Sequence, residues 1–393
     1  MIDDAGDGLV YADGNSLGRL TIDSRTSVDR LLVEWAASLV RGWDRWIDLP
    51  VSVGDQLAMR FLGASPGEVI VADTTTVNLY TLACAAVDDR PGRRVLVTDA
   101  DNFPTDRYVL EGIAEARGLE LRLFEGDPVH GPDAESLSAA LGDDVAVVCL
   151  SHVAYRSGAL ADMQGLTALV TGAGAHCIWD LSHSVGAVPI DLHEAGVGLA
   201  VGCTYKYLNA GPGAPAFLYV GAELQDRLRS PIWGWFGQRD QFEMAPRYEP
   251  AVGVTRFLTG TPDIVGLASL EAALQAFPDM ADASAKSAAI TALALELVDD
   301  WLVPLGCTVA TPLDPTRRGS HVAVAHADAW AICRALIERM HVIPDFRAPN
   351  IVRLGFPPLY SRYVDVWDAL DRTRQVLVRG WHHQVDAAPR RVT

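Results

Sequence analysis

Seven short apolar runs, several of them followed by a stretch of helical character, constrain this chain more than any other feature. The runs cover residues 69–73, 94–99, 119–124, 145–153, 176–181, 199–207 and 214–220. Several are almost continuously apolar, which is typical of strands buried on both faces of a sheet. Helical stretches at 76–89, 105–118 and 162–174 lie between them. This alternation predicts an α/β fold with a largely parallel sheet.

The pattern changes after about residue 261. Thr261-Pro262-Asp263 is a helix-start signal, and a long helical stretch follows at 283–303. A strand, a helix, a second strand and a final helix complete the chain. We therefore predict a large domain at 50–260 and a smaller α+β domain at 261–393. The first 49 residues are assigned to the smaller domain, because their helical stretch has no strand partner nearby.

Charge and cysteine content exclude several classes of protein. The net charge of −18 argues against binding to nucleic acid or to an anionic membrane surface. The acidic first 14 residues lack the apolar core of a secretory signal, and no apolar run is long enough to predict a membrane span. The six cysteines form no CxxC pair, which favours buried thiols in a reducing cytoplasm over disulfides or a zinc site. Residues 387–393 are expected to fray.

Lys206 is a charge within the otherwise uncharged stretch CTYKYLNAGPG, residues 203–213. Apolar runs flank this stretch, so the ammonium group is costly unless it is paired, exposed or covalently used. The plainest alternative is a lysine that extends its stem to the surface. Polar residues also follow other predicted strands, and ligands of open α/β sheets bind at the carboxyl ends of strands.

These strand ends together carry the parts of a pyridoxal phosphate site. Thr75 and Thr76 begin a helix, where a phosphate can bind, and Phe103 can stack on a ring. Asp180 can hold a protonated ring nitrogen, and a desolvated Lys206 can form a Schiff base. Each part alone has a more common explanation: a helix cap, a turn, or for His183 a core histidine. No His, Asp or Glu spacing resembles a metal site. The joint presence of the parts favours the cofactor site.

Longer motifs make the chain resemble the kynureninase family, fold-type I pyridoxal phosphate enzymes of the class V aminotransferase-like superfamily. The matching stretches are YADGNSLG, DTTTVNLY, DNFPTDRY, WDLSHSVGAVPIDL, VGCTYKYLNAGPGAPAFLYV, GWFG, RFLTGTP and DFRAPNIVRLGFPPLY. They run from Tyr11 to Tyr360 in the order of the family, and TYKYLNAGPG and RLGFPPLY are specific to it. The resemblance implies a transferase-like fold with a mostly parallel sheet in the large domain.

The resemblance also implies roles for individual residues. Lys206, Tyr205 and Asp180 would be catalytic, and Arg353 would bind the substrate α-carboxylate with its two-pronged guanidinium. Asn15, Ser16 and Trp43 would line the substrate site. The cofactor contacts would be Thr75, Thr76, Phe103, Thr105, Asp106, Ser151, Asp180, His183, Tyr205, Lys206, Trp235 and Thr261. Trp235 and Thr261 would come from the second subunit of a homodimer with shared active sites.

The implied reaction is hydrolysis of the β–γ carbon–carbon bond of L-kynurenine, or of a ring-substituted kynurenine, to anthranilate and L-alanine. It would belong to tryptophan catabolism by the kynurenine pathway and to NAD biosynthesis. By the resemblance, Trp43 stands where members have either tryptophan or histidine, and Thr261 where other members have asparagine, so we expect a preference for the unsubstituted substrate. Gln238 stands where members often have histidine, and its amide could serve a ring hydroxyl instead.

Two alternatives remain. One is a cysteine desulfurase or lyase of the same superfamily, although no cysteine lies in an obviously exposed loop. The other is a non-catalytic relative, against which the joint presence of Lys206, Asp180 and Arg353 argues.

Overall fold

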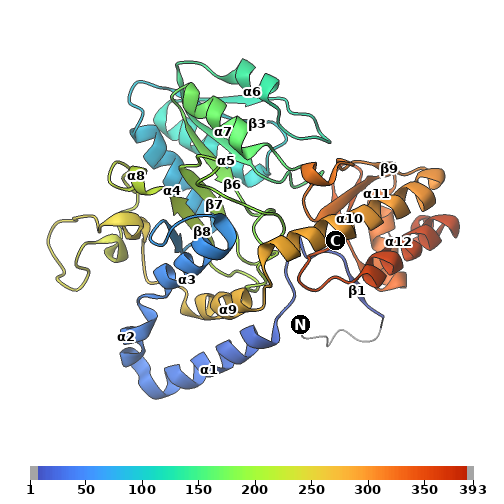
Figure 1. The fold of residues 1–393 in the computed structure, drawn as a ribbon, viewed down its shortest axis with the longest axis horizontal. Coiled ribbons are helices and arrows are strands. Elements are labelled where there is room, and N and C mark those ends of the chain that lie inside the picture. The colour runs from blue at the N-terminus through green and yellow to red at the C-terminus, as the bar shows by residue number, and fades with distance from the viewer. Residues whose placement is uncertain (1–7, 387–393) are drawn as a thin grey trace.

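Three sheets and the helices around them form the part of the chain that the computed structural model describes, residues 8–386 (Figure 1). The predicted frayed tail, 387–393, lies outside the described residues. The strands are β1 (Val10–Tyr11), β2 (Val69–Val71), β3 (Val95–Asp99), β4 (Glu120–Phe124), β5 (Val145–Ser151), β6 (His176–Asp180), β7 (Leu199–Gly202), β8 (Phe217–Val220), β9 (Thr308–Val309), β10 (His321–Ala325), β11 (Val342–Ile343), β12 (Asp345–Arg347) and β13 (Ile351–Gly355).

The α-helices include the predicted ones and short additional turns. They are α1 (Ile22–Ser38), α2 (Trp43–Trp46), α3 (Leu49–Leu57), α4 (Thr75–Asp88), α5 (Pro104–Arg117), α6 (Ala134–Ala140), α7 (Met163–Gly172), α8 (Ala222–Gln225), α9 (Ile264–Gln275), α10 (Met280–Trp301), α11 (Ala329–Met340) and α12 (Tyr363–Val378). Residues 58–62 form a π-helical turn after α3. No helix among residues 8–386 is long and apolar enough to cross a membrane.

The large sheet has seven strands in the order β2-β8-β7-β6-β5-β3-β4. Strand β8 runs antiparallel to both of its neighbours, and the other neighbouring pairs are parallel. The prediction of an α/β fold with a largely parallel sheet is therefore confirmed. Helices α4 and α5 pack against one face of this sheet, and α3, α7 and α9 contribute to the core on the other.

Several predicted strands are shorter in the structure, and the run at 199–207 differs most. The apolar run at 199–207 was predicted to be a strand throughout, but β7 ends at Gly202. Beyond it the backbone bonds within a turn: the Ala210 N–H donates to the Thr204 carbonyl, and Asn209 N–H donates to the Lys206 carbonyl. Asn209 adopts a positive φ of 59°, which suits asparagine better than most residues. Lys206 consequently lies on a loop at the end of the sheet.

The smaller region contains the antiparallel sheet β12-β13-β10-β9 and the two-stranded pair β1-β11. Helices α10, α11 and α12 bury one face of this sheet, where Val322, Val352 and Leu354 belong to the core. In Figure 1 helices α10, α11 and α12 of this region lie in orange and red beside the large sheet. The predicted smaller α+β region is thus present.

The packing of α1 and α9 differs from the predicted division at residues 49 and 261. Leu267 and Leu270 of α9 belong to the core of the large sheet. Helix α1 lies along α9, and Ser24 Oγ donates to the Ser269 carbonyl at 3.0 Å (Figure 1). From the N-terminal segment, β1 pairs with β11 of the smaller region. The division stays a prediction, and the packing favours grouping α1 and α9 with the large sheet.

Candidate active site

Polar residues at the carboxyl ends of the large sheet surround one cavity of about 350 Å³. Asp180 is the last residue of β6, Thr75 begins α4 after β2, and Lys206 follows β7. The lining residues are Thr74, Thr75, Thr76, Phe103, Thr105, Asp106, Asp180, Ser182, Tyr205, Lys206, Gly213, Ala214 and Ala216. The structure therefore brings together most of the residues that the sequence assigned to cofactor binding.

Lys206 is buried in this cavity without a carboxylate partner. The chain contains two lysines, and Lys206 is 8% exposed. Its Nζ lies 3.3 Å and 3.4 Å from the two ring nitrogens of His183, and 5.7 Å and 5.9 Å from the ring centres of Phe103 and Tyr205. No carboxylate oxygen lies within 4.0 Å of this Nζ among residues 8–386. The alternative of a stem that extends to the surface therefore does not describe this lysine.

His183 is a neutral neighbour of Lys206. Burial lowers the pKa of His183 well below its usual value, and the charges of Lys206 and Arg353 lower it further. A neutral imidazole can accept a hydrogen bond from the Lys206 ammonium group. It can also donate to an oxygen of a bound ligand.

Two carboxyl groups lie together opposite this lysine. Burial, and then the charge of Asp180, raise the pKa of Asp106 well above its usual value. Asp106 Oδ2 is buried without a hydrogen-bond partner among the described residues, while Asp180 Oδ1 accepts from the Ser182 N–H at 2.7 Å. The raised pKa favours the protonated form of Asp106, which places a hydrogen-bond donor beside Asp180 in the cavity.

The first turn of α4 provides an anion site at the same cavity. Thr74 caps this 14-residue helix, its Oγ1 accepting from the Val77 N–H at 3.3 Å. Thr75 and Thr76 add hydroxyl groups beside N–H groups that no helical carbonyl can satisfy. Such a helix start is suited to a phosphate group.

Ser151 does not line the cavity but supports one of its walls. Its Oγ donates to Asn102 Oδ1 at 2.7 Å, and the same oxygen accepts from the Phe103 N–H at 2.7 Å. The Phe103 ring meets Tyr155 edge to face, with ring centres 5.3 Å apart. The strand end thus fixes the aromatic wall.

These features fit pyridoxal phosphate. A phosphate site, an aromatic wall, a pair of carboxyl groups and a buried lysine surround a volume in the range of small-molecule sites. The unpartnered Asp106 oxygen and the uncompensated Lys206 indicate that a polar ligand completes the cavity.

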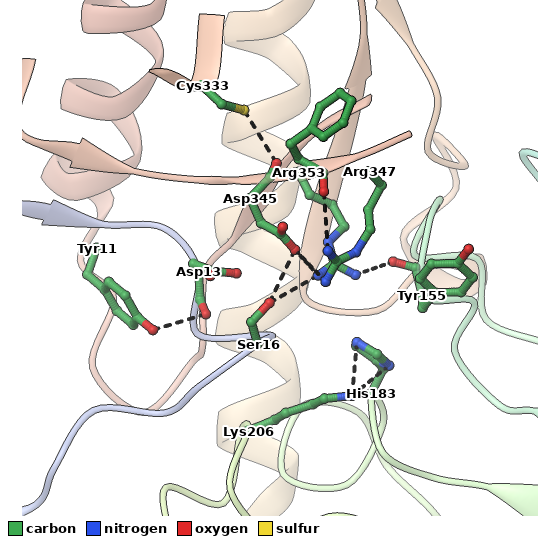
Figure 2. A network of polar contacts seen from close by, with 11 residues as sticks. Tyr11, Asp13, Ser16, Tyr155, His183, Lys206, Cys333, Asp345, Arg347 and Arg353 are labelled. Carbon is green, nitrogen blue, oxygen red and sulfur yellow. Dashed lines mark hydrogen bonds and ion pairs between the residues drawn. The ribbon is translucent and has the colours of Figure 1, made fainter. Parts of the chain in front are cut away.

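Arg353 forms the second predicted cluster, next to this cavity (Figure 2). It is fully buried and pairs with Asp345, and its Nη1 donates to the Tyr155 carbonyl. Ser16 Oγ accepts from Arg353 Nη2 at 3.2 Å. With the Asn15 amide in the orientation that satisfies its neighbours, its oxygen accepts from Nε and Nη2 at 3.0 Å. Asn15, Ser16 and Arg353 thus lie together, as expected.

Four residues assigned by sequence lie away from both clusters within one chain. Trp43 packs against Trp46 and Phe236, with ring centres 5.8 Å and 6.3 Å away. Trp235 and Thr261 are exposed. Gln238 accepts from the Glu249 N–H at 2.7 Å and lines a separate surface cavity.

Several residues near Arg353 were not singled out from the sequence. Asp345 Oδ2 lies 2.9 Å from Arg347 Nη2. Burial, and then the negative charge of Asp345, raise the pKa of Asp13 to about 6. His321 is fully buried, with its ring 5.9 Å from that of His183. The sequence could have indicated these residues. His321 lies in an alternating strand pattern in β10, and Arg353 has apolar neighbours on both sides in β13, so each strand presents a polar side chain on one face.

A group of possible metal ligands also lies outside the Lys206 cavity. The ligand atoms of Asp328, His382 and His383 come within 4.8 Å of one another. The rings of His382 and His383 lie 3.9 Å apart, and His382 Nδ1 lies 3.3 Å from the Val376 carbonyl. The sequence-based expectation of no metal site stays a prediction.

Comparisons with known proteins agree with the motifs. The kynureninase C-terminal domain model matches residues 283–373. A kynureninase from Pseudomonas fluorescens is 44% identical over 95% of this chain and 90% of its own length. One from Burkholderia pseudomallei (strain 1106a) is 42% identical over 94% of this chain and 89% of its own length.

Solved structures of lower identity share the fold. A C-DES variant with glycine covalently linked to its PLP cofactor superposes with a TM-score of 0.83 at 16% identity, covering 94% of this chain and 97% of its own. An apo cysteine desulfurase from Thermococcus onnurineus NA1 gives a TM-score of 0.81 at 17% identity, covering 94% and 95%. At these identities the likeness concerns the fold alone.

Proposed function

The chain belongs to the kynureninase family, and on this premise we propose that it hydrolyses the β–γ carbon–carbon bond of L-kynurenine, or of a ring-substituted kynurenine. The products are anthranilate and L-alanine, and pyridoxal phosphate is the cofactor. The observation that carries the proposal is Lys206, buried without a counter-ion in a cavity that also offers a phosphate site and a carboxyl pair. When bound, pyridoxal phosphate supplies an electron sink for the pair left at the substrate α-carbon.

Different residues of the cavity bind the cofactor and transfer protons. The α4 start with Thr75 and Thr76 would hold the phosphate, and Phe103 would form the wall against the ring. Asp180 would hold the proton on the ring nitrogen, and the raised pKa of Asp106 favours its protonated form beside it. Lys206 Nζ would move the proton at the substrate α-carbon, since its amine lines the cavity.

Tyr205 acts at the substrate γ-carbonyl. The charge of Cys203 and burial raise the pKa of Tyr205, so its phenol stays protonated at neutral pH. A protonated phenol can donate to the γ-carbonyl oxygen while water adds to the carbon, and it stabilises the negative charge that develops there. Arg353 binds the α-carboxylate and so sets which bonds face Tyr205 and Lys206.

A second copy of the chain completes the site. Trp235 and Thr261, the cofactor contacts expected from the other subunit, are exposed in one chain. The exposed Trp235 ring meets the exposed Phe242 ring edge to face, with ring centres 6.2 Å apart. Exposed apolar patches of this kind mark interaction sites. A homodimer should therefore be the species measured by light scattering at assay concentration.

The six cysteines bear on both the compartment and the alternative reaction. All six are buried and free. This supports a reducing cytoplasm, and a place in tryptophan catabolism by the kynurenine pathway and in NAD biosynthesis follows from the family. It also argues against a desulfurase that uses a mobile cysteine nucleophile, because no thiol is available at the surface.

Product identification tests the proposal. The purified protein, saturated with pyridoxal phosphate, is given L-kynurenine, 3-hydroxy-L-kynurenine or L-cysteine in separate reactions. We expect equimolar anthranilate and L-alanine from L-kynurenine, and slower release of the hydroxylated product. Sulfide and alanine from L-cysteine, with no cleavage of either kynurenine, would favour the desulfurase alternative.

A further inference from the structure

The small sheet carries Asp345 and Arg353 side by side on one face. The antiparallel register pairs Asp345 of β12 with Arg353 of β13. Val352 and Leu354, which flank Arg353, belong to the core beneath the sheet. Because successive residues of a strand point to opposite faces, Arg353 and its cross-strand partner Asp345 project away from that core. Figure 2 shows both side chains on the side of the sheet where His183 and Lys206 lie.

Asp345 is the buried counter-ion of a buried guanidinium. Arg353 is 0% exposed and Asp345 is 2% exposed, and Arg353 Nη2 forms an ion pair with Asp345 Oδ2. Arginine keeps its charge in a protein interior, so a buried arginine without a carboxylate is strongly unfavourable. Asp345 also pairs with Arg347 at 2.9 Å.

The contacts fix the plane of the guanidinium as well as its position. Ser16 Oγ accepts from Arg353 Nη2 at 3.2 Å and donates to Asp345 Oδ2 at 3.2 Å, which closes a triangle of polar contacts. The Asn15 amide oxygen occupies the Nε edge. On Nη1, the Tyr155 carbonyl accepts one of the two N–H bonds. The second Nη1 N–H is therefore the donor that these contacts leave available for a ligand.

We propose that Asp345 is a positioning residue for substrate recognition: it holds the guanidinium of Arg353 in the orientation that receives the α-carboxylate of an amino-acid substrate. This inference rests on the role of Arg353 in the proposed function. An N–H of the planar guanidinium meets a carboxylate oxygen only in a narrow range of orientations, so a rotated guanidinium keeps its charge and loses this contact. The effect of Asp345 must consequently depend on the substrate carboxylate.

A matched pair of substrates tests this dependence. In Asp345→Asn, kcat/KM for L-kynurenine should fall by about 10–100-fold, mainly through KM, which is the size expected for misplacement of a binding group. The α-carboxamide of L-kynurenine carries no negative charge and gains no charge-assisted hydrogen bond from Arg353, so its kcat/KM should change by less than about threefold. Equal losses for both substrates would show a purely structural role and overturn the proposal, as would an unchanged kcat/KM for L-kynurenine.

A control and a second variant keep the test decisive. Asp371 on α12 is also buried and arginine-paired, with Arg374 and Gln375 as partners, so Asp371→Asn should leave both substrates unaffected. If thermal unfolding shows that Asp345→Asn does not fold, Asp345→Glu replaces it. That variant keeps the charge but moves it by one methylene, and L-kynurenine must still lose more than the carboxamide does.

Binding measurements with non-reacting ligands test the role of Asp345 independently of the proposed catalytic activity. Calorimetry with L-alanine and L-alaninamide on the holoenzyme needs no turnover. Asp345→Asn should weaken binding of L-alanine and leave that of L-alaninamide unchanged, and equal effects would overturn the inference. Failure of the native enzyme to cleave any kynurenine would instead refute the proposed function, and the binding pair would still decide the role of Asp345.

Discussion

The Lys206 cavity and the Arg353 cluster lie next to each other but satisfy their polar groups in opposite ways. In the cavity, Asp106 Oδ2 has no partner among the described residues, and Lys206 has no carboxylate within ion-pair distance among residues 8–386. In the cluster, protein groups bind the guanidinium of Arg353 on Nε, Nη1 and Nη2. The first arrangement depends on a ligand to complete it, whereas the second is oriented before a ligand arrives.

This contrast predicts that substitutions in the two regions fail differently. Loss of a cavity residue should remove chemistry, because the cofactor contacts have no substitute. Loss of a cluster residue should mainly weaken recognition of the substrate, or change stability.

The largest effect is expected at Lys206. Lys206→Ala removes the base at the α-carbon, so turnover should fall by about 10³-fold or more, near the upper range for a general base. Lys286→Ala removes the other lysine of the chain, which lies on α10, and should keep native turnover. Steady-state anthranilate release measures both variants. Many turnovers by Lys206→Ala without added amine would show that loss of a cavity residue does not remove the chemistry, which contradicts the expected contrast with the Arg353 cluster.

Arg353→Lys should show a smaller loss of a different kind. Lysine keeps the charge but cannot reproduce the fork held by Asp345, Ser16 and the Tyr155 carbonyl. Loss of one charge-assisted hydrogen bond, worth about 1.5–3 kcal/mol, should raise KM for L-kynurenine by about 10–150-fold. The value of kcat should change less than KM. A native KM would exclude Arg353 from the substrate site.

Asp13, which lies near the Arg353 cluster, should affect the pH dependence of protein stability. Burial raises the pKa of Asp13 from 3.8 to about 6, so the folded state binds this proton more tightly than the unfolded state does. The stabilising contribution is complete below pH 3.8 and is lost as the pH rises through 6. Asp13→Asn stays neutral and should therefore gain stability relative to the native protein between pH 4 and pH 7, by ~1–2 kcal/mol after allowance for partial exposure.

Denaturant unfolding of both proteins at several pH values measures this difference. A stability difference that does not vary with pH would show that Asp13 titrates normally in the folded state.

Trp43 belongs to neither region in one chain, and its expected effect is the smallest. The native enzyme should prefer L-kynurenine to its 3-hydroxy form, and Trp43→His should shift the ratio of kcat/KM values toward the hydroxylated substrate by about 3–10-fold. Because Trp43 packs between Trp46 and Phe236, thermal unfolding must accompany the kinetics. A ratio that does not move would assign Trp43 to packing alone.

How far the sequence predicted the molecule differs between the two regions. In the cavity the prediction succeeded because parallel strands bring their carboxyl ends to one edge, so Thr75, Asp180 and Lys206 could be assigned to one place before their distances were known. The strand at 199–207 was predicted too long, because apolar residues continue into a turn that asparagine at 209 allows.

In the cluster the sequence named Arg353 but not its counter-ion. Asp345 and Arg353 become neighbours through antiparallel register, and Ser16 arrives from more than 300 residues away. Such contacts depend on tertiary packing and leave no local periodicity in the chain. The packing of α9 on the large sheet also depends on tertiary contacts, so it could not be predicted from the change of sequence pattern at residue 261.

The most direct test of the central claim is to find which lysine holds the cofactor. The holoenzyme is reduced with borohydride, which fixes pyridoxal phosphate onto the lysine that binds it, and its peptides are mapped by mass spectrometry. The label should lie on Lys206, persist in Lys286→Ala and be absent from Lys206→Ala. A label on Lys286 or on the amino terminus of the native protein would contradict the assignment of the cavity as the active site.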